Sequence, residues 1–204
     1  MNAQTNIVPT NYRIALDEAN RVRQIEPFTI EEIKAMQDKI SDLFLHLEHQ
    51  HKTLKQEQLK LIFVLYYACG LRLSEGFNLT AKDIDFNKRT IFINQGKGYK
   101  DRIIPMSDNV YNALQNYIYN FRNSIKCGHN RLFVQSSVGL SKDLKYLHSQ
   151  CNEAIQSKRL SFHILRHSIA THLLQNGMSV ENIARFLGHG CLESTQIYTH
   201  IVNR

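Results

Sequence analysis

The fold of this chain is decided by a short stretch near its C-terminal end, Ser161-Phe162-His163-Ile164-Leu165-Arg166-His167. Residues three apart on a helix lie about 60° apart around its axis, so His163 and Arg166 share one face. Beside that face runs an apolar stripe of Leu165, Ile169 and Leu173. The pattern predicts a helix over residues 163–176, packed by its stripe, with His163 and Arg166 in a cleft. A partly buried histidine beside a solvated arginine fits the same spacing.

The chain before this stretch predicts two further helices. Thr29-x-x-Glu32 is a capping box that opens a helix, expected to run to Leu47 and to end in the polar residues 49–52. A second helix is expected from about Lys55 to Cys69. Its apolar residues cover two faces, which is typical of a helix central to a core, and Gly70 ends it.

Between these helices and the deciding stretch, the pattern changes to that of a small sheet. Residues 90–93 and 102–104 are rich in isoleucine and predict paired strands, and Pro105 closes the second one. Further helices are expected near 107–123, 141–157, 180–187 and 192–200, with a short helix before the strands. The predicted fold class is therefore mainly α with a small antiparallel β-sheet.

The composition bounds the function only loosely. The chain has 204 residues, 43% of them hydrophobic, which suits one domain, or one with a small appendage. A net charge of +7 favours an anionic partner such as nucleic acid, although many basic proteins never bind DNA. Because no apolar run approaches the ~20 residues that span a bilayer, and the N-terminus lacks the apolar segment of a secretory signal, we expect a cytoplasmic protein.

Metal and disulfide chemistry find little support in the sequence. The four cysteines lie far apart without a CxxC pair, and we expect reduced thiols. Ten histidines invite a zinc hypothesis, but no HExxH motif or Cys/His ligand set appears. We therefore expect no metal and no cofactor.

Several basic residues are instead placed to hold a phosphodiester. Cleavage of DNA without metal requires cations on the phosphate, an in-line nucleophile and a proton for the departing sugar oxygen. Arg72 follows directly after the helix that Gly70 ends, and Glu75 is spaced to orient its guanidinium. A surface ion pair between residues three apart explains that segment equally well.

The loop and the tail supply the remaining groups. Lys97 stands between Gly96 and Gly98 at the hairpin tip, and Lys100 and Arg102 add positive charge as candidate DNA contacts. At the C-terminal end, the chain turns at His189 and a short helix delivers Tyr198. Taken alone, the loop reads as an ordinary solvated turn, and the tyrosine as an amphipathic residue on a terminal helix.

Together and in order, these motifs resemble the catalytic domain of the tyrosine recombinase (phage integrase) family. The resemblance rests on Gly-Leu-Arg72-Leu-Ser-Glu, Gly-Lys97-Gly, His163-x-x-Arg166-His, Leu-Gly-His189 and Ile-Tyr198-Thr-His. It runs from roughly Phe28 to the end and implies the DNA breaking-rejoining fold for residues 28–204. Residues 1–27 then form an arm or linker, the family's N-terminal core-binding domain is absent, and the size resembles fimbrial-switch invertases.

The resemblance also implies a role for each residue. Arg72, His163 and Arg166 hold the scissile phosphate, and Tyr198 attacks it to form a 3′-phosphotyrosyl link. Lys97 protonates the 5′ oxygen, and His189 supports phosphate binding and proton transfer. The implied function is site-specific recombination of double-stranded DNA, by integration, excision or inversion. The implied assembly is a homotetramer on DNA, with an accessory DNA-bending protein as a further candidate partner, and the bound protein is then nucleoid-associated.

Two alternatives remain open from the residues. A type IB topoisomerase uses the same chemistry but reseals the same strand. A DNA-binding regulator is the other, because residues 169–198 fit a helix-turn-helix with its turn at Asn176-Gly177-Met178. The regulator explains the charge but not Arg72, Lys97, His163 or Tyr198.

Overall fold

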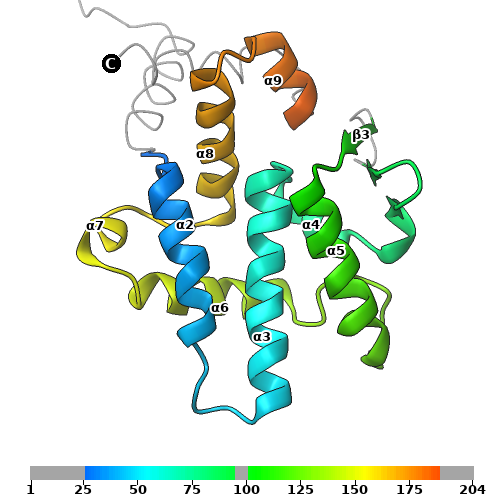
Figure 1. The fold of residues 1–204 in the computed structure, drawn as a ribbon, viewed down its shortest axis with the longest axis vertical. Coiled ribbons are helices and arrows are strands. Elements are labelled where there is room, and N and C mark those ends of the chain that lie inside the picture. The colour runs from blue at the N-terminus through cyan, green and yellow to red at the C-terminus, as the bar shows by residue number, and fades with distance from the viewer. Residues whose placement is uncertain (1–25, 95–100, 189–204) are drawn as a thin grey trace, which may run out of the picture.

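The computed structural model describes residues 26–94 and 101–188. Its architecture is mainly helical with one small sheet, which confirms the predicted fold class (Figure 1). The α-helices are α2 (Ile30–Lys39), α3 (His49–Ile62), α4 (Leu73–Asn78), α5 (Asp108–Asn120), α6 (Ser137–Ser149), α7 (Glu153–Gln156), α8 (Phe162–Gln175) and α9 (Val180–Leu187). Short 3-10 turns are η1 (Ile40–Asp42), η3 (Ala81–Asp83) and η4 (Arg122–Ser124), and η2 (Phe63–Ala68) is a π-helical continuation of α3.

The sheet has three antiparallel strands in the order β1-β2-β3. They are β1 (Ile84–Asp85), β2 (Thr90–Ile93) and β3 (Arg102–Pro105). The two predicted strands are confirmed, and Phe92 of β2 stands opposite Ile103 of β3 in their register. The sequence analysis missed β1 because two residues are too few to show an alternating pattern.

Helix α3 with its extension η2 forms the centre of the core, as the apolar pattern predicted. In Figure 1, α3 stands between α2 and α5, and α6 runs across behind α2 and α3. Helix α8 packs on η2, and it is tied to the start of the described chain by the Phe28 N–H, which donates to Ser168 Oγ at 2.9 Å. None of the helices in this part of the chain is long and apolar enough to span a membrane.

Two helix boundaries differ from the sequence prediction. The first helix ends at Lys39 and its 3-10 turn at Asp42, and the polar residues 49–52 open α3 rather than ending α2. The chain leaves the helical conformation at Leu43, which is extended, and Phe44 follows with a left-handed φ of 59° that prevents the helix from resuming. Its ring is only 5% exposed, so burial of the ring offsets the cost of this backbone conformation.

The predicted helix over residues 141–157 was wrong in both its start and its continuity. Helix α6 begins at Ser137, capped by the Ser136 hydroxyl, and α7 is a separate turn. Asn152 separates them because its side chain accepts from the Ile155 N–H at 3.0 Å and so starts a new helix. The expected helix at 192–200 lies outside the described residues.

Gly70 joins the core to the candidate site and supports a first test. Its φ is 59°, and a Cβ at this position would stand 2.8 Å from Leu187 Cδ2 of α9. We expect Gly70→Ala to lower the free energy of unfolding by about 1–3 kcal/mol, measured by thermal or urea unfolding. Gly177→Ala is the matched control, since Gly177 is also left-handed but its Cβ would meet nothing within 4 Å. Equal losses in both variants would contradict tight packing of Gly70 on α9.

Candidate active site

Arg72 lies where the core helix ends and α4 begins. It is the N-cap residue of α4, and its backbone N–H donates to Glu75 Oε2 at 2.8 Å. Its guanidinium donates from Nη1 to Glu75 Oε1 and from Nη2 to the Gly188 carbonyl, both at 2.7 Å. The side chain remains 33% exposed. The contact predicted between Arg72 and Glu75 is therefore present, and it is part of a larger arrangement than a surface pair.

Glu75 is the acceptor at the centre of this arrangement. Its side chain is 5% exposed and receives hydrogen bonds from Arg72 and also from Arg102, whose Nη1 and Nη2 reach one carboxylate oxygen each at 2.9 Å. Burial alone would raise the pKa of this carboxyl, but the hydrogen bonds and charge of Arg102, with those of Arg72, outweigh it and lower the pKa to about 2. Glu75 is therefore a carboxylate throughout the physiological pH range.

Arg166 is buried rather than solvated. It is 3% exposed, and it donates from Nη1 to the Gly70 carbonyl at 2.5 Å and from Nη2 to the Leu187 carbonyl at 2.8 Å. A buried guanidinium is tolerated only when its donors find acceptors. Here the acceptors are backbone carbonyls at the C-terminal ends of two helical segments, η2 and α9. The helix-face argument placed Arg166 on α8 correctly, but it did not reveal these carbonyls because they come from distant segments.

His163 is exposed on α8 and lies one turn before His167, which is buried. The two rings meet edge to face, with their Nε2 atoms 2.7 Å apart. Partial burial lowers the pKa of His163, and the positive charge of Arg166 lowers it further. At neutral pH the His163 ring is therefore uncharged and is able to accept or donate one proton.

Arg102 occupies a different place from the one expected of a DNA contact. Its side chain is 9% exposed, and its guanidinium faces Glu75 rather than solvent. Its Nε also donates to the Phe186 carbonyl at 3.1 Å. The sequence pattern grouped Arg102 with Lys100 because both are basic and close in the chain, but burial sets Arg102 apart.

The three arginines meet at the C-terminal end of α9. Each donates to a different backbone carbonyl, and the acceptors are consecutive: Phe186, Leu187 and Gly188. The C-terminal end of a helix carries a partial negative charge, which favours cations there. Glu75 binds two of the three guanidinium groups, those of Arg72 and Arg102, so among the described residues three positive charges face one carboxylate and leave a net positive charge suited to a phosphate. In Figure 1, α9 and the sheet lie toward the same end of the molecule.

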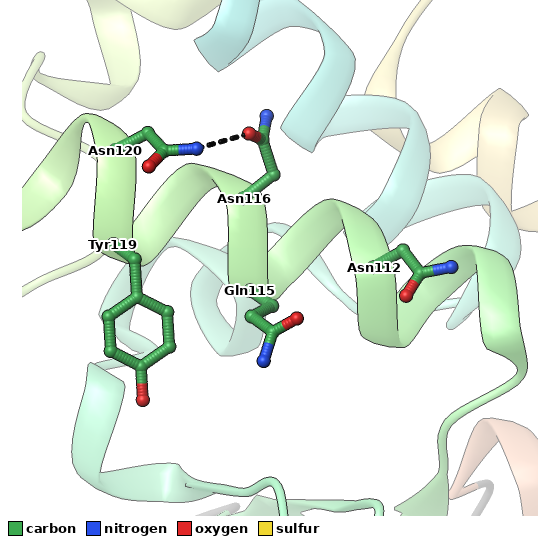
Figure 2. A pocket seen from close by; sticks show the side chains of 5 residues that line it. All are labelled: Asn112, Gln115, Asn116, Tyr119 and Asn120. Carbon is green, nitrogen blue, oxygen red and sulfur yellow. Dashed lines mark hydrogen bonds between the residues drawn. The ribbon is translucent and has the colours of Figure 1, made fainter.

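A hollow of about 350 Å³ on α5 differs in chemistry from the arginine cluster. All of its lining side chains come from α5 and none is charged: Asn112, Gln115, Asn116, Tyr119 and Asn120 (Figure 2). Asn120 donates to Asn116 within this set. Since it carries no cation, it is a poor candidate for a phosphate site. Across residues 26–94 and 101–188, no three side chains of the metal-binding types gather as ligands.

Comparison with known proteins assigns this arrangement to a family. The family model described as "Phage integrase family" matches residues 28–204, which include all three arginines and the predicted nucleophile. This chain belongs to the phage integrase family. As a member of the family, it shares with its relatives the helical domain and sheet described above.

Individual relatives agree with this assignment. Tyrosine recombinase XerC of Halalkalibacterium halodurans is 38% identical over 157 residues, covering 70% of this chain and 50% of that protein. Tyrosine recombinase XerC of Lacticaseibacillus casei is 30% identical over 189 residues, covering 86% and 63%. The crystal structure of XerA recombinase superposes with a TM-score of 0.68 at 28% identity, over 86% of this chain and 60% of that one. This phage integrase family member thus spans about half to two thirds of its relatives' length.

The structure places some predicted residues of this family member and not others. Arg72, Glu75 and Arg166 come together, and His163 lies on the same helix as Arg166. Lys97, Lys100, His189 and Tyr198 lie outside the described residues, and their roles stay predictions. The sequence analysis missed that Arg102 belongs to the buried cluster. The signal in the sequence was weak. Arg102 opens an apolar strand, and the sequence does not distinguish an exposed arginine at that position from one that is paired and buried.

Proposed function

We propose that this chain is the DNA-cleaving part of a site-specific tyrosine recombinase. The observation that carries the proposal is the pairing of Arg72 and Arg166 at adjacent carbonyls, directly before the segment from His189 to Tyr198. Two preorganised guanidinium groups next to a chain segment with a nucleophile are what phosphoryl transfer requires. Family membership supports the same conclusion.

The proposed reaction begins with attack on a DNA phosphate. The Tyr198 oxygen forms a bond to phosphorus while the bond from phosphorus to the 5′ oxygen breaks, leaving a 3′-phosphotyrosyl link. Lys97 gives a proton to the departing 5′ oxygen. The phenolic proton passes to a neutral base. We propose His163 because it is exposed on α8 three residues before Arg166, and its lowered pKa keeps the ring uncharged and free to accept a proton. Arg72 and Arg166 neutralise charge that develops on the non-bridging oxygens.

Rejoining reverses these steps with a 5′ hydroxyl from another strand. The covalent link retains the energy of the phosphodiester, so the reaction needs no nucleotide. We propose double-stranded DNA as the substrate, in keeping with a family neighbour of known structure, XerH site-specific recombinase, which was solved bound to its difH substrate. Exchange between two duplexes requires several protomers, and we propose a homotetramer on DNA, with an accessory DNA-bending protein where a site needs bending.

The proposal is tested by covalent trapping. Inverted repeats in the DNA flanking the gene supply candidate sites, made as duplexes with a nick beside each candidate phosphate so that the released fragment diffuses away. We expect a protein–DNA band that survives SDS. A helix-turn-helix regulator would bind the repeats without such a band, and a type IB topoisomerase would relax plasmids without exchanging strands; either result would overturn the proposal.

Lys97 is tested by changing the leaving group. We expect Lys97→Ala to slow cleavage of ordinary DNA by about 100- to 10,000-fold, because general acid catalysis is worth that much. When sulfur replaces the bridging 5′ oxygen, the leaving group is a thiolate that departs without a proton. Such a substrate should therefore restore single-turnover cleavage by Lys97→Ala. Failure of the thiol substrate to restore the rate would remove Lys97 from the role of acid.

A further inference from the structure

We propose that Arg102 is a positioning residue of the candidate active site and not a contact to DNA. It ties the carboxylate that holds Arg72 to the end of α9, so that Arg72 and the segment leaving α9 keep one relative position. This inference rests on the proposed function. Strand β3, which carries Arg102, then has a part in catalysis, although it lies far from Arg72 in the sequence.

The geometry of Arg102 uses its whole guanidinium. Nη1 and Nη2 bind the two oxygens of Glu75 in a bidentate pair, each at 2.9 Å, and Nε binds the Phe186 carbonyl at 3.1 Å. The side chain is 9% exposed. A bidentate pair holds a carboxylate in one orientation, whereas a single point charge does not. The same group that orients Glu75 therefore also holds α9 in place.

The carboxylate transmits this constraint to Arg72. Glu75 Oε1 accepts from both Arg72 Nη1 and Arg102 Nη1, and Oε2 accepts from both the Arg72 backbone N–H and Arg102 Nη2. Without Arg102, the carboxylate keeps its two bonds to Arg72 but loses its tie to β3 and to the end of α9, so Glu75 and Arg72 can shift together relative to α9. Arg72 also donates to Gly188, which is next but one to Phe186, so both arginines span the same gap between α4 and α9.

The surroundings of Glu75 make it sensitive to Arg102. The groups with an electrostatic effect on it or its partner are Arg72 at the start of α4, Arg102 of β3, and Tyr66 of η2, with the buried Cys69 next to Arg102. Burial raises the pKa of Cys69 to about 12, so this thiol is uncharged and does not add a second anion beside Glu75. Removal of Arg102 therefore raises the pKa of Glu75 relative to the wild type, because only the hydrogen bonds from Arg72 then oppose the effect of burial.

The first experiment uses Arg102→Lys in the full chain, with the nicked duplexes that trap the wild-type protein. Lysine keeps the charge beside Glu75 but cannot make the bidentate pair and the Phe186 contact together. We expect single-turnover cleavage at saturating protein to fall about 10- to 100-fold, in line with misplacement of a catalytic group by a fraction of an ångström to one ångström. DNA affinity and its salt dependence should equal those of the wild type.

Arg122→Lys is the matched control for loss of a structural arginine. Arg122 is also held by carbonyls, donating to those of Arg131 at 2.6 Å and His129 at 2.7 Å, but it has no link to Arg72. We expect this variant to lose stability without slower cleavage. If cleavage in both variants simply follows their melting temperatures, Arg102 is structural only and the inference is wrong.

A pH profile of Arg102→Met supplies a second readout. In the wild type, Glu75 has a pKa of about 2, so its contribution is complete from pH 5 to 8. In the variant the pKa rises, and the carboxylate is lost as pH falls through the new value. We expect the rate relative to wild type to decrease as pH is lowered from 8 to the acid limit at which the protein stays folded; a constant ratio over that range would show that Arg102 does not act through the Glu75 carboxylate.

The outcomes separate this inference from the proposed function. If the wild-type chain forms no covalent adduct, the proposed function fails and Arg102 is not at issue. If the wild type forms the adduct and Arg102→Lys forms it as fast, only the positioning role is wrong. If Arg102→Ala weakens DNA binding and reduces the salt dependence by about one counterion, Arg102 binds phosphate, and the inference is overturned.

Discussion

Tyr198→Phe is expected to abolish the covalent protein–DNA adduct while DNA binding is retained. The substitution removes one oxygen, which is the proposed attacking atom, and keeps the aromatic ring and its packing. No other group restores a phosphotyrosyl bond, so adduct formation should fall below detection. The measurement is SDS-resistant trapping on nicked duplexes, with the affinity for the same duplex determined in parallel.

Other tyrosines of the chain provide the control for this result. Tyr119 is 61% exposed on α5, an element that contributes no residue to the arginine cluster, and Tyr119→Phe removes only its exposed hydroxyl. We expect this variant to form the adduct at the wild-type rate. An adduct that survives in Tyr198→Phe would show that another residue is the nucleophile and would sink the assignment of Tyr198.

Arg72→Ala should reduce cleavage by at least about 100- to 1,000-fold. Removal of a single preorganised donor to a developing oxyanion costs that much, and Arg72 is charged and a third exposed, so it is able to reach a phosphate. The effect should appear in the single-turnover rate at saturating protein. Arg102 continues to neutralise Glu75 in the variant, so the fold should persist.

Arg89→Ala is the control for loss of an arginine from an ion pair. Arg89 pairs with Asp108 at 2.7 Å, with both side chains well exposed, and such pairs contribute about 0–1 kcal/mol. We expect cleavage and stability close to those of the wild type. Near-normal cleavage by Arg72→Ala, with Arg89→Ala unchanged, would show that Arg72 does not hold the phosphate.

The fold could be predicted wherever the residues repeat at helical spacing. The spacing of Val180, Ile183, Ala184 and Leu187 gave α9 its observed bounds, and the two longer strands were found from their isoleucines. Errors arose where tertiary burial overrides local preference. Phe44 is the example: nothing in the local sequence indicates that a phenylalanine adopts a left-handed backbone there, because the cause is the burial of its ring.

The candidate site was predictable as a set of residues but not as a network. Motif order singled out Arg72, Glu75 and Arg166, and the structure brings them together. The partners of the two arginines are backbone carbonyls of distant segments, and a carbonyl leaves no mark on the sequence. For the same reason Arg102 read as a solvated cation, although the three-dimensional structure buries it against Glu75.

The hydrogen bonds at the end of α9 join side-chain donors to main-chain acceptors, and mutation affects these two kinds of group differently. The donors are side chains, and each is lost by a single codon change. The acceptors are main-chain carbonyls, which remain when the side chain of the same residue is replaced. Phe186 illustrates the difference, since its carbonyl receives Arg102 while its ring packs on the core, so an apolar residue that keeps this packing also keeps the bond. Random mutagenesis should therefore recover far more active variants at position 186 than at the arginine that binds it.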